Sequence, residues 1–287
     1  MKKLISLLSF IFIGFAAVVN AESPVWKVTK GNHHLYLGGT IHLLGKSDYP
    51  LPPAFNTAYH EASRLVFEAD MMKFQSPEYQ NIFMQKISYP DDKSLKDVLN
   101  KKNLVALEKF FTDRDMPFDP MLRFKPGMLV MMLTVIEMKR LNIAGIGVDQ
   151  FYINKGLKEG KKFSFLEEVD EQLAFIVDMG KDNPNELVEY TLRDMHQLAT
   201  QLAAIKKAWR TGNNAELKKV ALIPWKDGFP ELYNTLMVKR NHKWIPKIEN
   251  MLKTKEVEFV MFGALHMVGD DGVLKLLQQR GYTIQKL

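Results

Sequence analysis

Two seven-residue stretches near opposite ends of the chain share one pattern. The first is Gly39-Thr40-Ile41-His42-Leu43-Leu44-Gly45, and the second is Gly263-Ala264-Leu265-His266-Met267-Val268-Gly269. Each follows a short apolar run that is typical of a buried strand. A glycine at a strand end lets the backbone turn, so the histidine three residues later is expected at the carboxyl edge of the sheet, where open α/β sheets bind ligands. The stretches therefore predict one shared site, commonly a metal site. The alternative is two structural turns whose histidines make hydrogen bonds.

Further strand patterns lie mostly towards the two ends of the chain, with helical periodicity between them. Residues 25–29 and 34–37 predict a hairpin around Lys30-Gly31-Asn32. The other predicted strands are 64–68, 162–166, 256–262 and 282–287. The predicted helices are 54–63, 76–140 with two interruptions, 148–159, 169–179, 185–210, 230–250 with a kink or break at Pro246, and 272–279. The pattern predicts an α/β fold of α+β-like layout, whose sheet is built from both ends of the chain around a helical central insertion.

The N-terminal residues have the pattern of a secretory signal peptide. Lys2 and Lys3 precede an almost wholly apolar stretch over 4–18, and Val19-Asn20-Ala21 resembles a cleavage site. We therefore expect a signal peptide over 1–21, a single domain over 22–287, and a periplasmic or secreted protein with no membrane span after cleavage. The alternative is an uncleaved membrane anchor, for which the apolar stretch is short.

Composition narrows the chemistry. The chain contains no cysteine, so it forms no disulfides and any metal site must use histidines and carboxylates. Its formal charge is +6, which falls by two when the signal-peptide lysines are removed. Basic and acidic residues are interspersed, without the basic run that nucleic-acid binding requires. No nucleophile elbow or phosphate-binding glycine loop is present. Nucleic acid is therefore not expected as a partner.

Carboxylates follow two of the other predicted strands. Glu68 and Asp70 are two residues apart at a strand end, which predicts that both point to one face. Glu167 follows the strand over 162–166 and is expected at the same edge of the sheet; its alternative is a charge at a helix N-terminus. Arg240 lies late in a predicted helix, where arginines are most often solvated.

Several short pieces recur in a fixed order along the chain. Besides the two GxxH turns, they are Phe67-Glu68-Ala69-Asp70, Lys125-Pro126, Gly147-Val148-Asp149, Leu166-Glu167 with Gln172, Arg240-Asn241 and Arg280-Gly281-Tyr282. In order and spacing they resemble the TraB/GumN family, which includes the animal TIKI proteins, across almost the whole mature chain. Two departures are Gly127, where relatives often carry Trp, and Glu168, where they often carry Thr; both bear on local packing or pocket shape.

The resemblance implies a fold related to erythromycin-esterase-like and haem-binding ChaN-like proteins. For the TIKI branch it implies metal-dependent proteolysis in which the two motif histidines and an acidic residue are essential. Carried over to this sequence, these residues are His42, His266 and Glu68, with Arg240 as a further site residue.

With this resemblance, the leading prediction is a periplasmic metal-dependent hydrolase of the peptidase type, whose partner is a peptide or small-molecule substrate. His42 and His266 would hold a divalent Mn, Co or Zn ion, with Glu68 as third ligand or general base and Asp70 as the alternate carboxylate.

Two further residues complete the predicted site. Arg240 would neutralise the oxyanion or hold a substrate carboxylate, and Glu167 would be a second acid/base. One rival hypothesis is a non-catalytic protein that binds haem or a peptide. The other is a metal-free esterase-like hydrolase, in which histidine and glutamate act directly as acid and base.

Overall fold

The computed structural model describes residues 23–143 and 145–287. The predicted signal peptide over 1–21 therefore lies outside the described residues. Within the described part of the chain, no helix is both long enough and apolar enough to cross a bilayer.

The core of the molecule is a six-stranded mixed sheet in the order β4-β3-β5-β2-β1-β6. Its strands are β1 (Val25–Lys30), β2 (His33–Thr40), β3 (Arg64–Phe67), β4 (Lys162–Phe165), β5 (Glu258–Gly263) and β6 (Thr283–Lys286). β4, β3, β5 and β2 run parallel to one another, whereas β1 pairs antiparallel with both β2 and β6. The predicted hairpin is present, and β6 is an edge strand as expected. The α/β class is confirmed, and the helical insertion stays a prediction.

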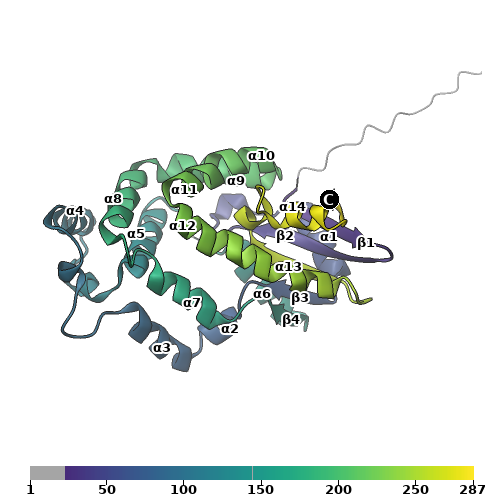
Figure 1. The fold of residues 1–287 in the computed structure, drawn as a ribbon, viewed down its shortest axis with the longest axis horizontal. Helices are drawn as coiled ribbons and strands as arrows, with labels where there is room; N and C mark the ends of the chain where they lie inside the picture. The colour runs from purple at the N-terminus through teal and green to yellow at the C-terminus, as the bar shows by residue number, and fades with distance from the viewer. Residues whose placement is uncertain (1–22, 144) are drawn as a thin grey trace, which may run out of the picture.

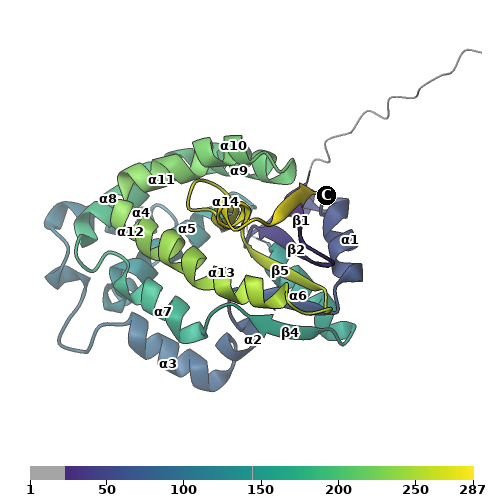
Figure 2. The same cartoon turned by 45° about the vertical axis from the view of Figure 1, so that its right-hand side comes forward.

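The two faces of the sheet carry different helices. Successive strand residues point to opposite faces, so Phe259 and Phe262 of β5 face opposite ways. The Phe259 ring packs against Phe55 of α1 (Pro53–Glu61) and Tyr152 of α6 (Val148–Lys158). The Phe262 ring packs against Trp244 of α13 (Lys239–Met251). α14 (Val273–Gln279) contacts α13, and Figure 2 shows α13 lying across the strands.

The remaining helices form a large part of the molecule beside the sheet, at the left of Figure 1. They are α2 (Met71–Phe74), α3 (Pro77–Ile87), α4 (Lys101–Thr112), α5 (Pro126–Arg140), α7 (Val169–Asp178), α8 (Pro184–Asp194), α9 (Leu198–Arg210), α10 (Asn214–Leu217), α11 (Ile223–Gly228) and α12 (Pro230–Tyr233). Two hydrophobic clusters that are separate from the sheet core hold α3, α4, α5, α7 and α8 together. α9 to α12 instead contribute to the sheet core itself, for example with Trp209, Leu217 and Tyr233.

Two helix predictions need correction. The helix expected over 185–210 is split into α8 and α9 by a 3₁₀ turn at Met195–Gln197, although its apolar periodicity runs through without a proline or glycine. Pro246 neither breaks nor ends α13. Pro246 and His242, four residues earlier, both lie on the exposed face, so water can solvate the carbonyl group that proline leaves unbonded.

Gly127 explains one departure from the family pattern. A Cβ atom added there would lie 2.1 Å from the carbonyl oxygen of Ile176 and 2.8 Å from the Cβ atom of Met179. The start of α5 therefore packs directly against the end of α7, and this arrangement has no room for a tryptophan side chain.

Candidate active site

Four neighbouring parallel strands end at the same edge of the sheet, and each delivers one polar residue there. Glu167 follows β4, Glu68 follows β3, His266 follows β5 and His42 follows β2. A Cβ atom added to Gly263 would lie 3.4 Å from Glu68 Oε1, 3.6 Å from His266 Cδ2 and 3.9 Å from His42 Nε2. The structure therefore brings His42, Glu68 and His266 together, although 224 positions separate the histidines in sequence.

His42 is oriented by a carboxylate from α6. Its Nδ1 atom lies 2.8 Å from Asp149 Oδ2, so the Nδ1–H group donates to Asp149 and Nε2 faces Gly263. The start of α6 can approach this closely because Gly147 has no side chain, and a Cβ atom there would lie 2.1 Å from the His42 carbonyl oxygen. The side chain of His42 is 66% exposed whereas that of Asp149 is 15% exposed, so the ring is accessible from solvent.

His266 is held by an amide from α13. The Asn241 Nδ2 group donates to the Asp271 carbonyl oxygen at 2.7 Å, so Asn241 Oδ1 is free to accept from His266 Nδ1 at 2.6 Å. A neutral ring that donates from Nδ1 carries its lone pair on Nε2. That lone pair accepts from Arg240 Nη1 at 3.1 Å. His266 is buried and both of its nitrogens are engaged.

Arg240 is the centre of the site. Its Nε and Nη2 groups donate to the two oxygens of Glu167, at 3.1 and 2.5 Å, and Nη2 also donates to Glu68 Oε2 at 2.6 Å. Nη1 donates to His266 Nε2 and to the Leu236 carbonyl oxygen. A guanidinium group has five N–H donors, and all five are engaged here. The alternative of a solvated surface arginine is wrong, because the side chain is only 11% exposed.

The two glutamates have different access to solvent. Glu68 Oε1 accepts the Gly263 amide at 2.7 Å, and Oε2 accepts Arg240 and Gln172. Glu167 has a fully buried side chain that also accepts from Trp244 Nε1 at 3.2 Å and from Gln172 at 3.0 Å. A substrate cannot reach Glu167 in this arrangement, so the predicted second acid/base is instead a buried partner of Arg240.

These contacts set the ionisation of the site. The negative charge of Asp149 raises the pKa of His42 to about 9. Burial raises the pKa of Glu68, but the nearby positive charges, chiefly Arg240, outweigh it and lower the pKa to about 2. Burial lowers the pKa of His266 to about 3. At neutral pH, His42 is therefore protonated, Glu68 is ionised and His266 is neutral.

A cavity of about 240 Å³ opens beside these groups. It is lined by Glu68, His42, Asp149 and Gln172, and by the apolar side chains of Phe67, Met71 and Ile153 among others. The Nε2 atom of His42 has no hydrogen-bond partner among the described residues, so it is available to a bound molecule. A polar acid–base pair with an apolar wall is typical of a small-molecule or side-chain pocket.

Asp70 takes a different place from the one predicted. β3 ends at Phe67, so strand alternation no longer applies two residues beyond Glu68. The Asp70 Oδ1 atom instead accepts the amides of Met72 and Lys73 and caps α2.

The role of Asp149, Asn241 and Gln172 was not predicted from sequence. All three stand within the short sequence pieces on which the family resemblance rests. Asn241 directly follows Arg240 and Gln172 belongs to the piece that begins at Leu166-Glu167, whereas Asp149 has no predicted site residue beside it in the sequence.

The predicted divalent ion would need His42, His266 and Glu68 to be free to bind it. Each histidine has Nδ1 engaged and Nε2 turned towards the site, which is how metal-binding histidines are held. However, Glu68, the predicted third ligand, and the His266 imidazole both accept hydrogen bonds from Arg240, whose guanidinium lies between them. Among the described residues no three His, Asp or Glu side chains are placed to share an ion. As arranged, these residues do not fit a metal ion.

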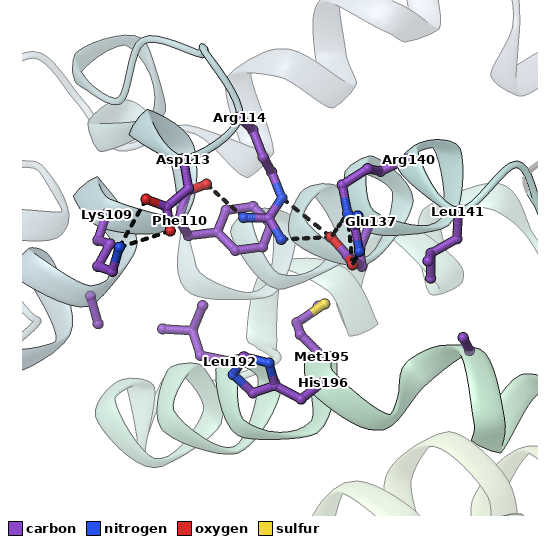
Figure 3. A pocket seen from close by; sticks show the side chains of 12 residues that line it. Lys109, Phe110, Asp113, Arg114, Glu137, Arg140, Leu141, Leu192, Met195 and His196 are labelled. Carbon is purple, nitrogen blue, oxygen red and sulfur yellow. Dashed lines mark hydrogen bonds and ion pairs between the residues drawn. The ribbon is translucent and has the colours of Figure 1, made fainter.

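A second, larger hollow lies in the helical region, away from the sheet edge. It encloses about 430 Å³ between α4, α5 and the α8–α9 junction. Figure 3 shows Arg114 and Arg140 on either side of Glu137, with Leu192, Met195 and His196 opposite. Glu137 accepts from Arg114 at 2.7 Å and from Arg140 at 2.6 Å. Arg114, Glu137 and Arg140 form the helical cluster. The sheet-edge cluster comprises His42, Glu68, Asp149, Glu167, Arg240, Asn241 and His266.

Comparison with known proteins places the chain in a family. The model of the TraB/PrgY/gumN family matches residues 24–286, so the chain belongs to that family. The chain is also 25% identical over 251 residues to "Uncharacterized protein YbaP" of Escherichia coli (strain K12), covering 86% of this chain and 89% of that protein. The protein of the same name from Shigella flexneri matches with the same identity and coverage. No solved structure matches.

Proposed function

We propose that this protein is a hydrolase that cleaves an amide or ester bond with His42 and Glu68 as its acid–base pair. The observation that carries the proposal is the accessible Nε2 atom of His42, held by Asp149 beside the Glu68 carboxylate in one cavity. A histidine oriented by a buried carboxylate is the arrangement that hydrolases use for proton transfer.

The ionisation of the pair assigns the roles. A pKa of about 9 keeps His42 protonated at neutral pH, so it is suited to donate a proton to a leaving group. A pKa of about 2 keeps Glu68 ionised, so it can orient a water molecule and accept its proton. The opposite assignment would require the neutral form of His42, which is a minor species at pH 7.

The proposed reaction balances with water as the only co-reactant. Glu68 takes a proton from water as the hydroxide adds to the carbonyl carbon. The tetrahedral intermediate then collapses, the bond to the leaving nitrogen or oxygen breaks, and His42 Nε2–H protonates the leaving group. The proton on Glu68 returns to His42 through solvent, which restores both groups.

Arg240 and Glu167 act as positioning residues in this scheme. Because all five N–H groups of Arg240 are engaged, it does not donate to the substrate directly. It fixes Glu68 and keeps it ionised, and its charge lies near the developing oxyanion. Glu167 holds the guanidinium through two hydrogen bonds.

The substrate and the compartment are inferred from sequence. The N-terminal pattern supports export, which suggests a periplasmic or secreted enzyme. The family resemblance favours peptides as substrates, and the cavity of about 240 Å³ suits one side chain better than a large cofactor such as haem.

Turnover of a library of unstructured peptides and aryl esters tests the proposal. The wild type should cleave at least one substrate, and His42→Ala and Glu68→Gln should reduce kcat/KM by roughly 10²–10⁴-fold. Glu189→Gln is the matched control, because it makes the same chemical change at an exposed pair with Lys102. Binding without turnover, or equal turnover by wild type and His42→Ala, would favour the non-catalytic rival.

A further inference from the structure

We infer that the Arg240 guanidinium is the resident cation of the sheet-edge cluster and takes the place of the divalent ion that the sequence predicts. The wild-type protein would then bind no divalent ion at His42, Glu68 and His266. This inference concerns ion binding alone and does not depend on hydrolysis.

The hydrogen bonds of Arg240 support this inference first. A metal held by His266 and Glu68 needs the Nε2 lone pair of the imidazole and an oxygen of the carboxylate. Both atoms already accept from Arg240, at 3.1 and 2.6 Å. The other Glu68 oxygen accepts the Gly263 amide. Metal–ligand bonds of about 2 Å to these atoms cannot form while the guanidinium lies between them.

The charge of the cluster supports the same conclusion. Glu68 and Glu167 supply two negative charges, and Arg240 lies within hydrogen-bonding distance of both. A divalent ion placed next to this buried guanidinium would meet strong like-charge repulsion, because the local dielectric is low. Removing Arg240 would free two carboxylates and the His266 imidazole from the guanidinium they share, and carboxylates with an imidazole are a donor set that divalent ions favour.

The setting of Arg240 makes displacement costly. Its guanidinium lies 4.8 Å from the Trp244 ring centroid and 5.3 Å from that of Phe175. Arg240 stands on α13 next to Asn241, which holds His266. Swinging the arginine out would leave five N–H groups and two carboxylates to be satisfied by other partners.

Ion uptake by purified variants tests this inference. The wild type, Arg240→Ala and Arg114→Ala are each incubated with Mn²⁺, Co²⁺ or Zn²⁺, freed of excess ion and analysed by mass spectrometry. We expect stoichiometric metal in Arg240→Ala only. Arg114→Ala is the matched control, since it removes an arginine from the helical cluster and leaves Glu137 paired with Arg140. Arg240→Ala/His266→Ala should lose the metal again.

Two results would overturn the inference. One is stoichiometric metal in the wild type that His42→Ala and His266→Ala both lose. The other is a folded Arg240→Ala variant, judged by circular dichroism, that takes up no ion. Arg240→Lys keeps a cation in place and should remain free of metal, so the wild type and this variant decide the question even where Arg240→Ala does not fold.

Discussion

Two clusters of charge among the described residues have opposite compositions. In the sheet-edge cluster one guanidinium, Arg240, joins two carboxylates. In the helical cluster one carboxylate, Glu137, joins two guanidinium groups. Glu137 accepts hydrogen bonds from both Arg114 and Arg140. The pKa of Glu137 is lowered chiefly by the hydrogen bonds from Arg140. The sheet-edge cluster also presents to its cavity a histidine, His42, whose ring is oriented by Asp149.

The difference follows from where each cluster stands in the fold. Parallel strands end at the same edge of the sheet, so the residues that follow β4, β3, β5 and β2 lie close together there. Among the described residues, His42 Nε2 keeps no hydrogen-bond partner in this group. The helical cluster spans α4 and α5, where Arg114 also covers the Phe110 ring at 3.6 Å. Its hydrogen bonds join helices. Buried charge alone is therefore a weaker indication of a functional site than buried charge beside an accessible proton-transfer atom.

The largest expected difference between the clusters is in stability. Arg240→Ala removes the guanidinium that the buried carboxylates of Glu68 and Glu167 share, which should cost about 3–5 kcal/mol. Arg114→Ala leaves Glu137 with Arg140 and should cost less, about 1–3 kcal/mol, which includes the lost packing. Urea unfolding followed by circular dichroism measures both variants. Equal losses would show that the sheet-edge carboxylates do not depend on Arg240.

The next effect sharpens the role of His42. Because Asp149 raises the pKa of His42 to about 9, a general acid at this position should keep kcat/KM high up to about pH 9 and lose it above. Asp149→Asn removes the charge, so the alkaline limb should move down towards the ordinary histidine value of 6.5. Asp149→Glu should restore part of the shift.

The pH profile also separates the two possible assignments. If His42 were the general base, kcat/KM would rise towards pH 9 instead of falling above it, and the roles of His42 and Glu68 would be reversed. Glu189→Gln, far from His42 on an exposed pair, should leave the profile unchanged.

Much of the fold could be predicted from periodicity and from the two glycine–histidine turns. The strand bounds agree with the structure to within two residues for β3, β4 and β5. That His42, Glu68 and His266 would converge followed from the rule that parallel strands share one edge. The sequence pattern predicts no helix or strand over 213–228. In the structure this region contains α10, a π-helical turn at Lys218–Leu222, and α11.

The details of the site could not be predicted because they depend on tertiary contacts. Sequence periodicity places Arg240 on a helix but does not show that the helix face packs over the strand ends. Glu167 followed a strand as expected, yet its full burial under Trp244 is a packing outcome. Asp70 was placed beside Glu68 because the strand was expected to continue, and it ends at Phe67.

The smallest expected effect lies at the rim of the helical cluster. Lys109 donates to Asp113 at 2.9 Å one helical turn away, but the two side chains are 73% and 51% exposed. Exposed pairs at this spacing contribute about 0.3–0.5 kcal/mol, because water screens the charges and both side chains lose freedom. Lys109→Gln should therefore lower the unfolding free energy by no more than that, and the difference should vanish in 1 M salt, where the screening length is about 3 Å. A loss comparable to that of Arg240→Ala would mean that the Lys109–Asp113 pair supports the Arg114–Glu137 contact. Exposed charge would then contribute as much to the stability of this protein as buried charge does.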